Sequence, residues 1–242
     1  MLDVKWAKEW LQLSAKIINA HRDELIELDR VIGDGDHGEN LDRGFQAVAA
    51  GLADSTFTTP AEVFKFAAQT LLSTVGGASG PLLGTAFLRA AKAAKAVDSP
   101  QLSAADSLQI LQAALMGIQE RGKAVPGEKT MVDAWSAALA AAQAAAQVAG
   151  QNSNNLPDAL SASPASQVEP CKIWEAAAAG AAKGAAATAD LCARKGRASY
   201  LGERSIGHLD PGAVSSAYIL AAAAQAAQVA QADQANHVAD AH

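Results

Sequence analysis

The chain has 242 residues, of which 50% are hydrophobic but only 5% are aromatic, and its formal net charge is −6. This length is enough to bury a sizeable core in one large domain, and the low aromatic content argues against a β-sandwich. The acidic balance excludes a general nucleic-acid or anionic-membrane binder, so any phosphate must be bound locally. No apolar leader follows Met1 and no run of eighteen apolar residues occurs, so we expect a cytoplasmic protein.

Apolar residues recur at helical spacing along the chain, which predicts an all-α fold. Asp3 can cap a first helix, residues 59–62 form a capping box with proline at the first helical position, and Ser103 with Asp106 forms another capping pair. We expect helices from Asp3 onward with a break between residues 21 and 28, and then over about 38–54, 60–73, 81–97, 104–122, 131–148, 171–193 and from 212 toward the C-terminus.

Residues 150–170 are rich in Asn, Ser and Pro, and we expect them to form the longest and most mobile connection. They do not look like a domain linker, because neither half of the chain alone contains all the motif loops. We therefore expect a single domain over residues 1–242, whose tail frays from about residue 228. About eight helices with mostly short connections predict an up-and-down antiparallel arrangement.

The positions of the motifs along this arrangement predict where a ligand binds. Alternate loops emerge at the same end of an up-and-down arrangement. All the glycine-rich and charged motifs fall in the first, third, fifth and seventh connections, whereas the other connections contain only caps and filler. A composite site at one end is therefore expected from four segments, residues 29–38, 76–81, 121–130 and 194–212.

The first segment places the carboxylates of Asp29, Asp34 and Asp36 within eight residues. Helical geometry alone does not bring all three to one face, but Gly33 and Gly35 allow the chain to bend until they converge. Converging oxygen ligands with no cysteine beside them suit Mg²⁺ or Ca²⁺. The final acidic ligand of an EF-hand is missing, which favours Mg²⁺ with phosphate. The alternative is a solvated acidic turn between two helices.

The glycine-rich segment 76–80 leads into a helix, and its unobstructed N–H groups together with the helix N-terminus attract phosphate. It matches neither the Walker A nor the Rossmann pattern. The alternative is a plain helix-to-helix turn in which Ser79 is the N-cap.

His37 follows Asp36 at a helix start, and there a hydrogen bond to phosphate is favoured over a phosphorylated intermediate.

The third and fourth segments carry cations. Residues 121–131 can bring basic side chains and a helix start toward an anion, with Met131 flat against a base; a solvated basic turn is the alternative. Residues 194–204 contain three arginines and one lysine. Arg197 is our candidate for neutralising charge on a transferring phosphoryl group, and the alternative is a surface salt-bridge network with the acidic residues.

These four segments resemble the DhaL family, the nucleotide-binding subunits of dihydroxyacetone kinases. The matching stretches are LDRVIGDGDHG (28–38), LSTVGGASGPL (72–82), RGKAVPGEKTM (121–131) and RKGRASYLGERSIGHLDPGA (194–213), and the resemblance covers nearly the whole chain. The resemblance implies a barrel of eight antiparallel helices that binds ADP at one end through two Mg²⁺.

The same resemblance implies a residue-level site. The family's metal ligands fall on Asp29, Asp34 and Asp36, which with Arg197 form the expected catalytic set. The implied contacts to ADP or ATP fall on His37, Gly38, Asn40, Ala78, Ser79, Gly122, Met131, Arg197, Asp210 and Gly212.

The family contains two kinds of protein, one that exchanges ATP as a substrate and one that keeps ADP as a coenzyme. His37, and a chain without an attached dihydroxyacetone-binding domain, resemble the second kind. Its phosphoryl donor is phosphoenolpyruvate by way of a phosphotransferase-system subunit, DhaM, and its acceptor is dihydroxyacetone held on a separate subunit, DhaK. We see no general base in this chain, which fits a substrate that the partner subunit activates.

Three alternatives remain open. One is an ATP-dependent kinase subunit for dihydroxyacetone or another short ketose. Another is a nucleotide-sensing protein that binds a transcriptional regulator, and the last is a metal-binding structural module. None of these readings involves nucleic acid or a membrane.

Overall fold

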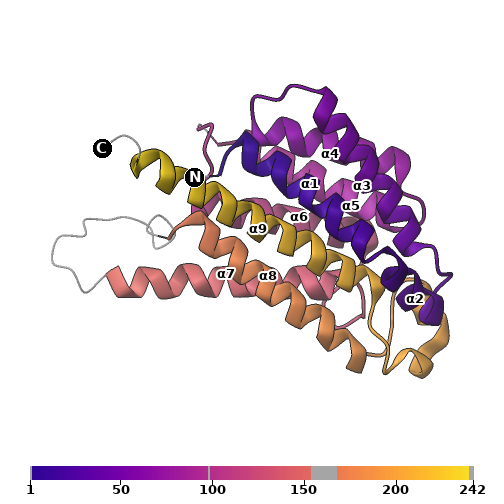
Figure 1. Cartoon of the computed structure of the whole chain (residues 1–242). Coiled ribbons are helices and arrows are strands. Elements are labelled where there is room, and N and C mark those ends of the chain that lie inside the picture. Colours follow the sequence, from indigo (N-terminus) through magenta and orange to yellow (C-terminus); the bar gives the residue numbers. More distant parts are fainter. Residues whose placement is uncertain (1, 98, 154–167, 240–242) are drawn as a thin grey trace.

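The computed structural model describes residues 2–97, 99–153 and 168–239 (Figure 1). Within these residues the chain is helical, and the only β-type contact is an isolated bridge between Leu2 and Leu102. The helices are α1 (Val4–Ala20), α2 (Arg22–Ile32), α3 (His37–Asp54), α4 (Pro60–Thr74), α5 (Ser79–Lys95), α6 (Ala104–Gly122), α7 (Met131–Ser153), α8 (Pro170–Ala187) and α9 (Pro211–Ala239), with 3₁₀ segments η2 (Thr188–Asp190) and η3 (Arg197–Ser205).

The predicted all-α fold is confirmed, and the helix contacts form a closed cycle. From α3 to α9 each helix packs on the next one along the chain, and both α3 and α9 pack on α1. Figure 1 shows α1 and α9 running side by side although they lie at opposite ends of the sequence. The regular barrel that the family resemblance implies stays a prediction beyond this cycle of contacts.

The predicted caps explain several helix starts. The Asp3 side chain accepts hydrogen bonds from the N–H groups of Lys5 and Trp6, and complete capping boxes begin α4 and α6. Each box satisfies backbone donors that have no partner within the helix. The expected break in the first helix is present at His21, which separates α1 from α2.

Other boundaries differ from those expected. The helix expected from residue 81 begins at Ser79, and the helix expected to reach 193 ends at Ala187 and is followed by η2. The polar loop expected after it contains η3. Helix α7 continues past 148 to Ser153, so the predicted loop 150–170 begins later, and its residues 154–167 lie outside the described residues. Helix α9 continues past residue 228 to Ala239.

An aromatic cluster forms the centre of the core and joins α1 to α9. The rings of Trp6 and Trp10 lie 5.2 and 5.0 Å from the ring of Trp174, measured between centroids. The indole N–H groups of Trp6 and Trp10 donate to the α9 carbonyls of Ala223 and Ile219, at 3.2 and 2.8 Å. These bonds satisfy buried donors and fix the first helix against the last one.

Alanine and glycine allow close helix packing in the C-terminal half. A Cβ atom added at Gly180 would lie 2.5 Å from the backbone oxygen of Ala137, and one at Gly184 would lie 2.6 Å from that of Asp133. Helix α8 therefore approaches α7 too closely for any larger residue at these points.

Among the described helices, α9 over Pro211–Ala235 is long and apolar enough to cross a membrane, but 61% of its most apolar stretch is buried inside the protein. Packing between α1, α7 and α8 accounts for that composition.

Candidate active site

The four segments expected at one end of the molecule all line one cavity of about 460 Å³. It lies where the turn between α2 and α3, the glycine-rich turn before α5, the loop before α7 and the loop before α9 meet. We call residues 194–210 the arginine loop. Figure 1 shows this end of the molecule beside α2, and η3 of the arginine loop packs on that helix.

Asp29, Asp34 and Asp36 converge as predicted. One carboxylate oxygen from each lies within 4.8 Å of the others, and we call this set the acidic cluster. Asp29 comes from α2, whereas the other two lie in the turn before α3. Gly35 makes the turn possible because its φ of +76° is unfavourable for other residues. The three charges repel one another, so the cluster is suited to a cation with a preference for hard oxygen ligands.

The buried carboxylate of Asp29 is held by the backbone of the next helix. Its Oδ2 atom accepts hydrogen bonds from the N–H groups of Asp36 at 3.0 Å and His37 at 3.2 Å. Burial raises the pKa of Asp29; the two hydrogen bonds oppose this effect, and the charges of the other two carboxylates add to it. A Cβ atom at Gly33 would lie 2.1 Å from Oδ1 of Asp29, so glycine is needed beside this carboxylate.

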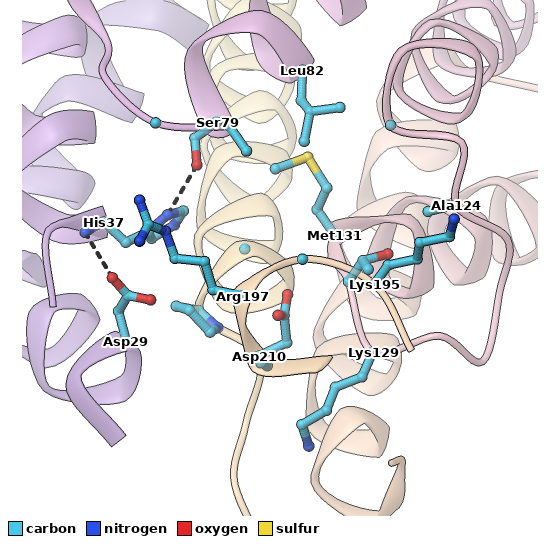
Figure 2. A pocket seen from close by; sticks show the side chains of 18 of the residues that line it. Asp29, His37, Ser79, Leu82, Ala124, Lys129, Met131, Lys195, Arg197 and Asp210 are labelled. Carbon is cyan, nitrogen blue, oxygen red and sulfur yellow. Dashed lines mark hydrogen bonds between the residues drawn. The ribbon is translucent and has the colours of Figure 1, made fainter. Parts of the chain in front are cut away.

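Arg197 lies across from the acidic cluster. Its Nη2 atom is 2.9 Å from Oδ2 of Asp34, and the arginine side chain is 63% exposed. This is the salt bridge that the simpler alternative predicts, and it also shows that the guanidinium group reaches the carboxylates. Figure 2 shows Arg197 extending across the cavity toward Asp29 and His37.

His37 is buried between two hydroxyl groups, whose pattern assigns its tautomer. The hydroxyl of Ser215 donates to the carbonyl of Gly212 at 3.1 Å, so it accepts from the Nε2–H group of His37 at 2.9 Å. The Nδ1 atom then accepts from the hydroxyl of Ser79, which lies 3.0 Å away. Burial lowers the pKa of His37 to about 4, so the ring is neutral near pH 7. Its observed bonds hold Ser79 at the cavity (Figure 2).

The start of α5 offers free backbone donors to the cavity. Ala78 precedes the helix and provides no side-chain cap, so the first N–H groups of α5 lack that partner. Such a helix start attracts anions. Asn40 lies beside the glycine turn, because a Cβ atom at Gly76 would be 2.9 Å from its Oδ1 atom. The Asn40 side chain in turn accepts a hydrogen bond from Arg43 at 2.5 Å.

The side of the cavity formed by α5, α6 and α7 is apolar. Met131 faces Leu82 in Figure 2, and Ile118 also lines this side. Gly122 keeps the space open, since an added Cβ atom would lie 3.0 Å from Leu82. Gly212 similarly lies next to Met131 and Asp210. A flat apolar group such as a nucleobase fits this wall, with its charged part toward the acidic cluster.

Gly38 is the predicted contact residue that does not line the cavity. A Cβ atom there would lie 2.2 Å from the backbone oxygen of Arg22, so Gly38 allows α3 to approach α2. Its predicted nucleotide contact stays a prediction. The other predicted residues line the cavity: Asp29, Asp34, Asp36, His37, Asn40, Ala78, Ser79, Gly122, Met131, Arg197, Asp210 and Gly212.

The sequence analysis did not predict that Lys129 and Asp133 hold the loops at this end of the molecule through hydrogen bonds to the backbone. Asp133 accepts from the N–H groups of Gly127 at 2.5 Å and Thr130 at 2.8 Å, and so orders the turn before α7. Lys129 is only 1% exposed. The sequence predicted that this cation reaches toward an anion, with a solvated basic turn as the alternative, and neither describes a buried lysine bonded to backbone carbonyls. Asp133 had a detectable signal, since an acidic residue in the first turn of a helix commonly binds free backbone donors.

Asp210 lies at the base of the arginine loop and begins α9. Its Oδ2 atom accepts from the N–H group of Ala213 at 2.7 Å. Burial raises the pKa of Asp210 to about 7; this hydrogen bond opposes the shift, as does the nearby charge of Lys129. Asp210 therefore titrates near neutral pH in the nucleotide-free protein.

Comparison with known proteins shows the family to which the chain belongs. The model of the DAK2 domain matches residues 31–225, which include all four cavity segments apart from Asp29 and Arg30 at the start of the first. The chain belongs to the DAK2 domain family. It is 41% identical over 223 residues to the Listeria innocua protein named "PEP-dependent dihydroxyacetone kinase 1, ADP-binding subunit DhaL", covering 92% of this chain and 96% of that protein.

Other family members show the same relationship. The chain is 42% identical to the ADP-binding subunit DhaL of the PEP-dependent dihydroxyacetone kinase of Escherichia coli, over 90% of this chain and 95% of that protein. Among solved structures, the dihydroxyacetone kinase of C. freundii in complex with AMP-PNP and Mg²⁺ is similar with a TM-score of 0.63 and 23% identity. The match covers 90% of this chain and 33% of that longer one, and it supports the helical fold of the family.

Proposed function

We propose that the protein is the ADP-binding subunit of a phosphoenolpyruvate-dependent dihydroxyacetone kinase. In this role it transfers a phosphoryl group to dihydroxyacetone held on a separate DhaK subunit, and a DhaM partner restores the bound nucleotide from ADP to ATP. The observation that carries the proposal is the convergence of the acidic cluster, the free N-terminus of α5 and Arg197 on one cavity. The relatives that match over nearly their whole length carry the corresponding subunit name.

The acidic cluster fits the Mg²⁺ ions that the family resemblance implies. Asp29, Asp34 and Asp36 supply hard oxygen donors, and their mutual repulsion is part of what raises the pKa of Asp29. Bound Mg²⁺ would neutralise negative charge on the phosphate oxygens. We assign all three carboxylates to the metal.

The remaining residues have binding and positioning tasks. The start of α5, with Ala78 and Ser79, would bind phosphate oxygens through its N–H groups, and neutral His37 keeps the Ser79 side chain in place. Met131 would contact the base. Arg197 would place its guanidinium group against the transferring phosphoryl group, where negative charge must be balanced during transfer.

We expect the partner subunit, and not His37, to supply the group that activates the acceptor. His37 has both ring nitrogens hydrogen-bonded and a lowered pKa. The arginine loop would present a docking surface for DhaK, since Tyr200 is 89% and Ile206 47% exposed on the same loop as Arg197. A partner that covers this loop would exclude water from the transfer. We place the reaction in the cytoplasm, where phosphotransferase-system partners are found.

Native mass spectrometry of the gently purified protein tests the proposal. We expect a mass that includes ADP and two Mg²⁺ after desalting, and we expect Asp34→Ala to lose them. Glu39→Ala is the matched control, because Glu39 is an exposed carboxylate of α3 outside the acidic cluster. The protein should then support phosphorylation of dihydroxyacetone by phosphoenolpyruvate when both partners are added.

Two other outcomes would favour the alternatives. A protein that carries no nucleotide but turns over ATP freely with a ketose-binding partner would be an ATP-dependent kinase subunit. A protein that binds nucleotide and a transcriptional regulator but supports no transfer would be a sensor. Either outcome would contradict the coenzyme function.

A further inference from the structure

Lys129 is a buried cation in a segment whose basic side chains were expected to reach an anion or to be solvated. Its side chain is 1% exposed, although lysine is rarely fully buried without an acidic partner. Its backbone has a φ of 60°, in the left-handed region that favours glycine. Lys129 forms no ion pair with a carboxylate in the described part of the chain. The charges of Asp210, Asp190 and Asp133 favour the ammonium group from beyond ion-pair distance, and a further, direct interaction holds its side chain in place.

That interaction is a pair of hydrogen bonds to backbone carbonyls. The ammonium group of Lys129 donates to the oxygens of Thr188 and His208. Thr188 follows the last residue of α8, where carbonyl groups lack partners within the helix and the helix dipole favours a positive charge. His208 lies near the end of the arginine loop. The side chain therefore connects the end of α8 to that loop.

Both ends of the arginine loop are held at this point. At its start, the N–H group of Arg194 donates to the carbonyl of Glu128, the residue before Lys129, at 3.1 Å. Near its end, Lys129 binds the carbonyl of His208, and the N–H group of Gly207 donates to Ala189 at 2.8 Å. The residues that bind the loop thus lie next to one another. Holding both ends of residues 194–210 restricts the positions open to the arginine between them.

The Lys129 side chain itself does not reach toward the reacting groups. Figure 2 shows it running away from Arg197 and Met131, with its ammonium group on the far side of Asp210. Its effect on the acidic cluster therefore has to pass through the arginine loop. The Nη2 atom of Arg197, on that loop, lies 2.9 Å from Asp34.

We infer that Lys129 is a positioning residue, whose bonds to the carbonyls of Thr188 and His208 hold the arginine loop so that Arg197 faces the acidic cluster. The inference rests on the phosphoryl-transfer role proposed for Arg197. Displacement of a catalytic group by about 1 Å can cost about 10²-fold in rate, so the loss of these bonds should lower kcat by that order. Nucleotide and metal should still bind, because most of their other predicted contacts lie on α2, α3, α5, α6 and α7 and in the turn before α3.

A double-mutant experiment separates this role from a general structural one. Lys129→Met keeps the length of the side chain but removes its donors, whereas Lys129→Gln keeps an N–H donor. In the complete phosphoenolpyruvate-driven system we expect kcat to fall about 10²-fold for Lys129→Met and less for Lys129→Gln, with KM and ADP retention within a few-fold of the wild type. Lys183→Met is the control, since Lys183 is exposed one turn before the end of α8.

The decisive arm combines Lys129→Met with Arg197→Ala. If Lys129 acts through Arg197, the double variant should have the same residual activity as Arg197→Ala alone. A further loss in the double variant would overturn the inference, and so would an unchanged kcat in Lys129→Met. If Arg197→Ala itself kept full activity, the proposed function of Arg197 would fail first, which distinguishes the two failures.

Hydrogen exchange provides a readout without activity. In Lys129→Met, the amides of the arginine loop, including Gly207, should exchange faster while those of α1 and α4 stay protected. If Lys129→Met does not fold, Lys129→Gln is measured in the same way. Uniformly faster exchange, or failure of both variants to fold, would make Lys129 a residue of the core and overturn the positioning role.

Discussion

The two charged sides of the cavity are built in different ways. The acidic cluster joins a helix to the tight turn that follows it, and Asp29 is buried and bonded to the backbone of α3. The arginine loop has a 63% exposed arginine, is held at its two ends, and packs through Ala198 of η3 against Ile32 of α2. From this difference we predict that the cluster retains ions between turnovers, whereas the exposed guanidinium group of Arg197 is accessible to a transferring group and to a docking partner.

Removal of the arginine should have the largest effect and should separate transfer from retention. For Arg197→Ala we expect kcat to fall about 10³-fold or more, because the charge on the transferring group loses its cation. ADP retention should change little, because the acidic cluster is intact. Arg197→Lys should recover only part of the rate, since lysine lacks the planar fork. Steady-state kinetics beside native mass spectrometry measures both quantities, and equal losses in the two would remove the distinction.

A substitution on the acidic side should do the reverse. In Gly33→Ala the new Cβ atom would lie 2.1 Å from Oδ1 of Asp29 and displace that carboxylate. We expect Mg²⁺ affinity to fall about 10- to 100-fold and ADP to be lost with it. Val31→Ala is the control, because Val31 is a 46% exposed residue of the same helix. Isothermal titration with Mg²⁺ measures the affinity, and an unchanged value in Gly33→Ala would contradict the proposed metal site.

The smallest expected effect is on the free energy of unfolding. It comes from Asp210 at the base of the arginine loop and depends on pH. The pKa of Asp210 is raised from 3.8 to about 7, so the folded state holds a proton that the unfolded chain loses between about pH 4 and pH 7. The free energy of unfolding contributed by this group should fall as pH rises through that window and level off above it. Asp210→Asn should remove this part of the slope.

Urea unfolding of nucleotide-free protein at pH 5, 6, 7 and 8 measures the Asp210 effect. The difference in unfolding free energy between wild type and Asp210→Asn should become less favourable to the wild type as pH rises. The charges of Asp133, Asp29 and Lys129 stay the same in both proteins, so their contributions cancel to first order. Parallel pH profiles would show that Asp210 is already ionised in the folded state.

The composite site could be predicted because the order of the motifs along the chain determines which end of the helical arrangement each one occupies. Alternate helix connections share an end, and the glycine-rich and charged motifs fall in only one set. Residues in the glycine turn and the acidic cluster also have local chemistry that sequence patterns express, such as Gly35 at a positive φ. The predicted cavity-lining residues follow from those two features, and the residue roles stay predictions until tested.

The remaining features depend on contacts between distant parts of the chain. The ammonium group of buried Lys129 donates to the carbonyls of Thr188 and His208. These acceptors lie 59 and 79 residues further along the chain, so no local sequence pattern predicts the contact. The end of α8 at Ala187 was missed because an alanine-rich sequence has no helix breaker there. The close approach of Gly38 to Arg22 depends on how α3 packs against α2, and its predicted nucleotide contact stays a prediction.

The two tryptophan bonds from α1 to α9 have a consequence for biosynthesis. During synthesis, α1 leaves the ribosome first, but the carbonyls that accept from Trp6 and Trp10 belong to Ala223 and Ile219, more than 200 residues later. The cycle of helices therefore cannot close co-translationally from the N-terminus, and α1 keeps an apolar face uncovered until α9 has emerged. Nascent chains of this fold need protection from aggregation over almost the whole of their elongation.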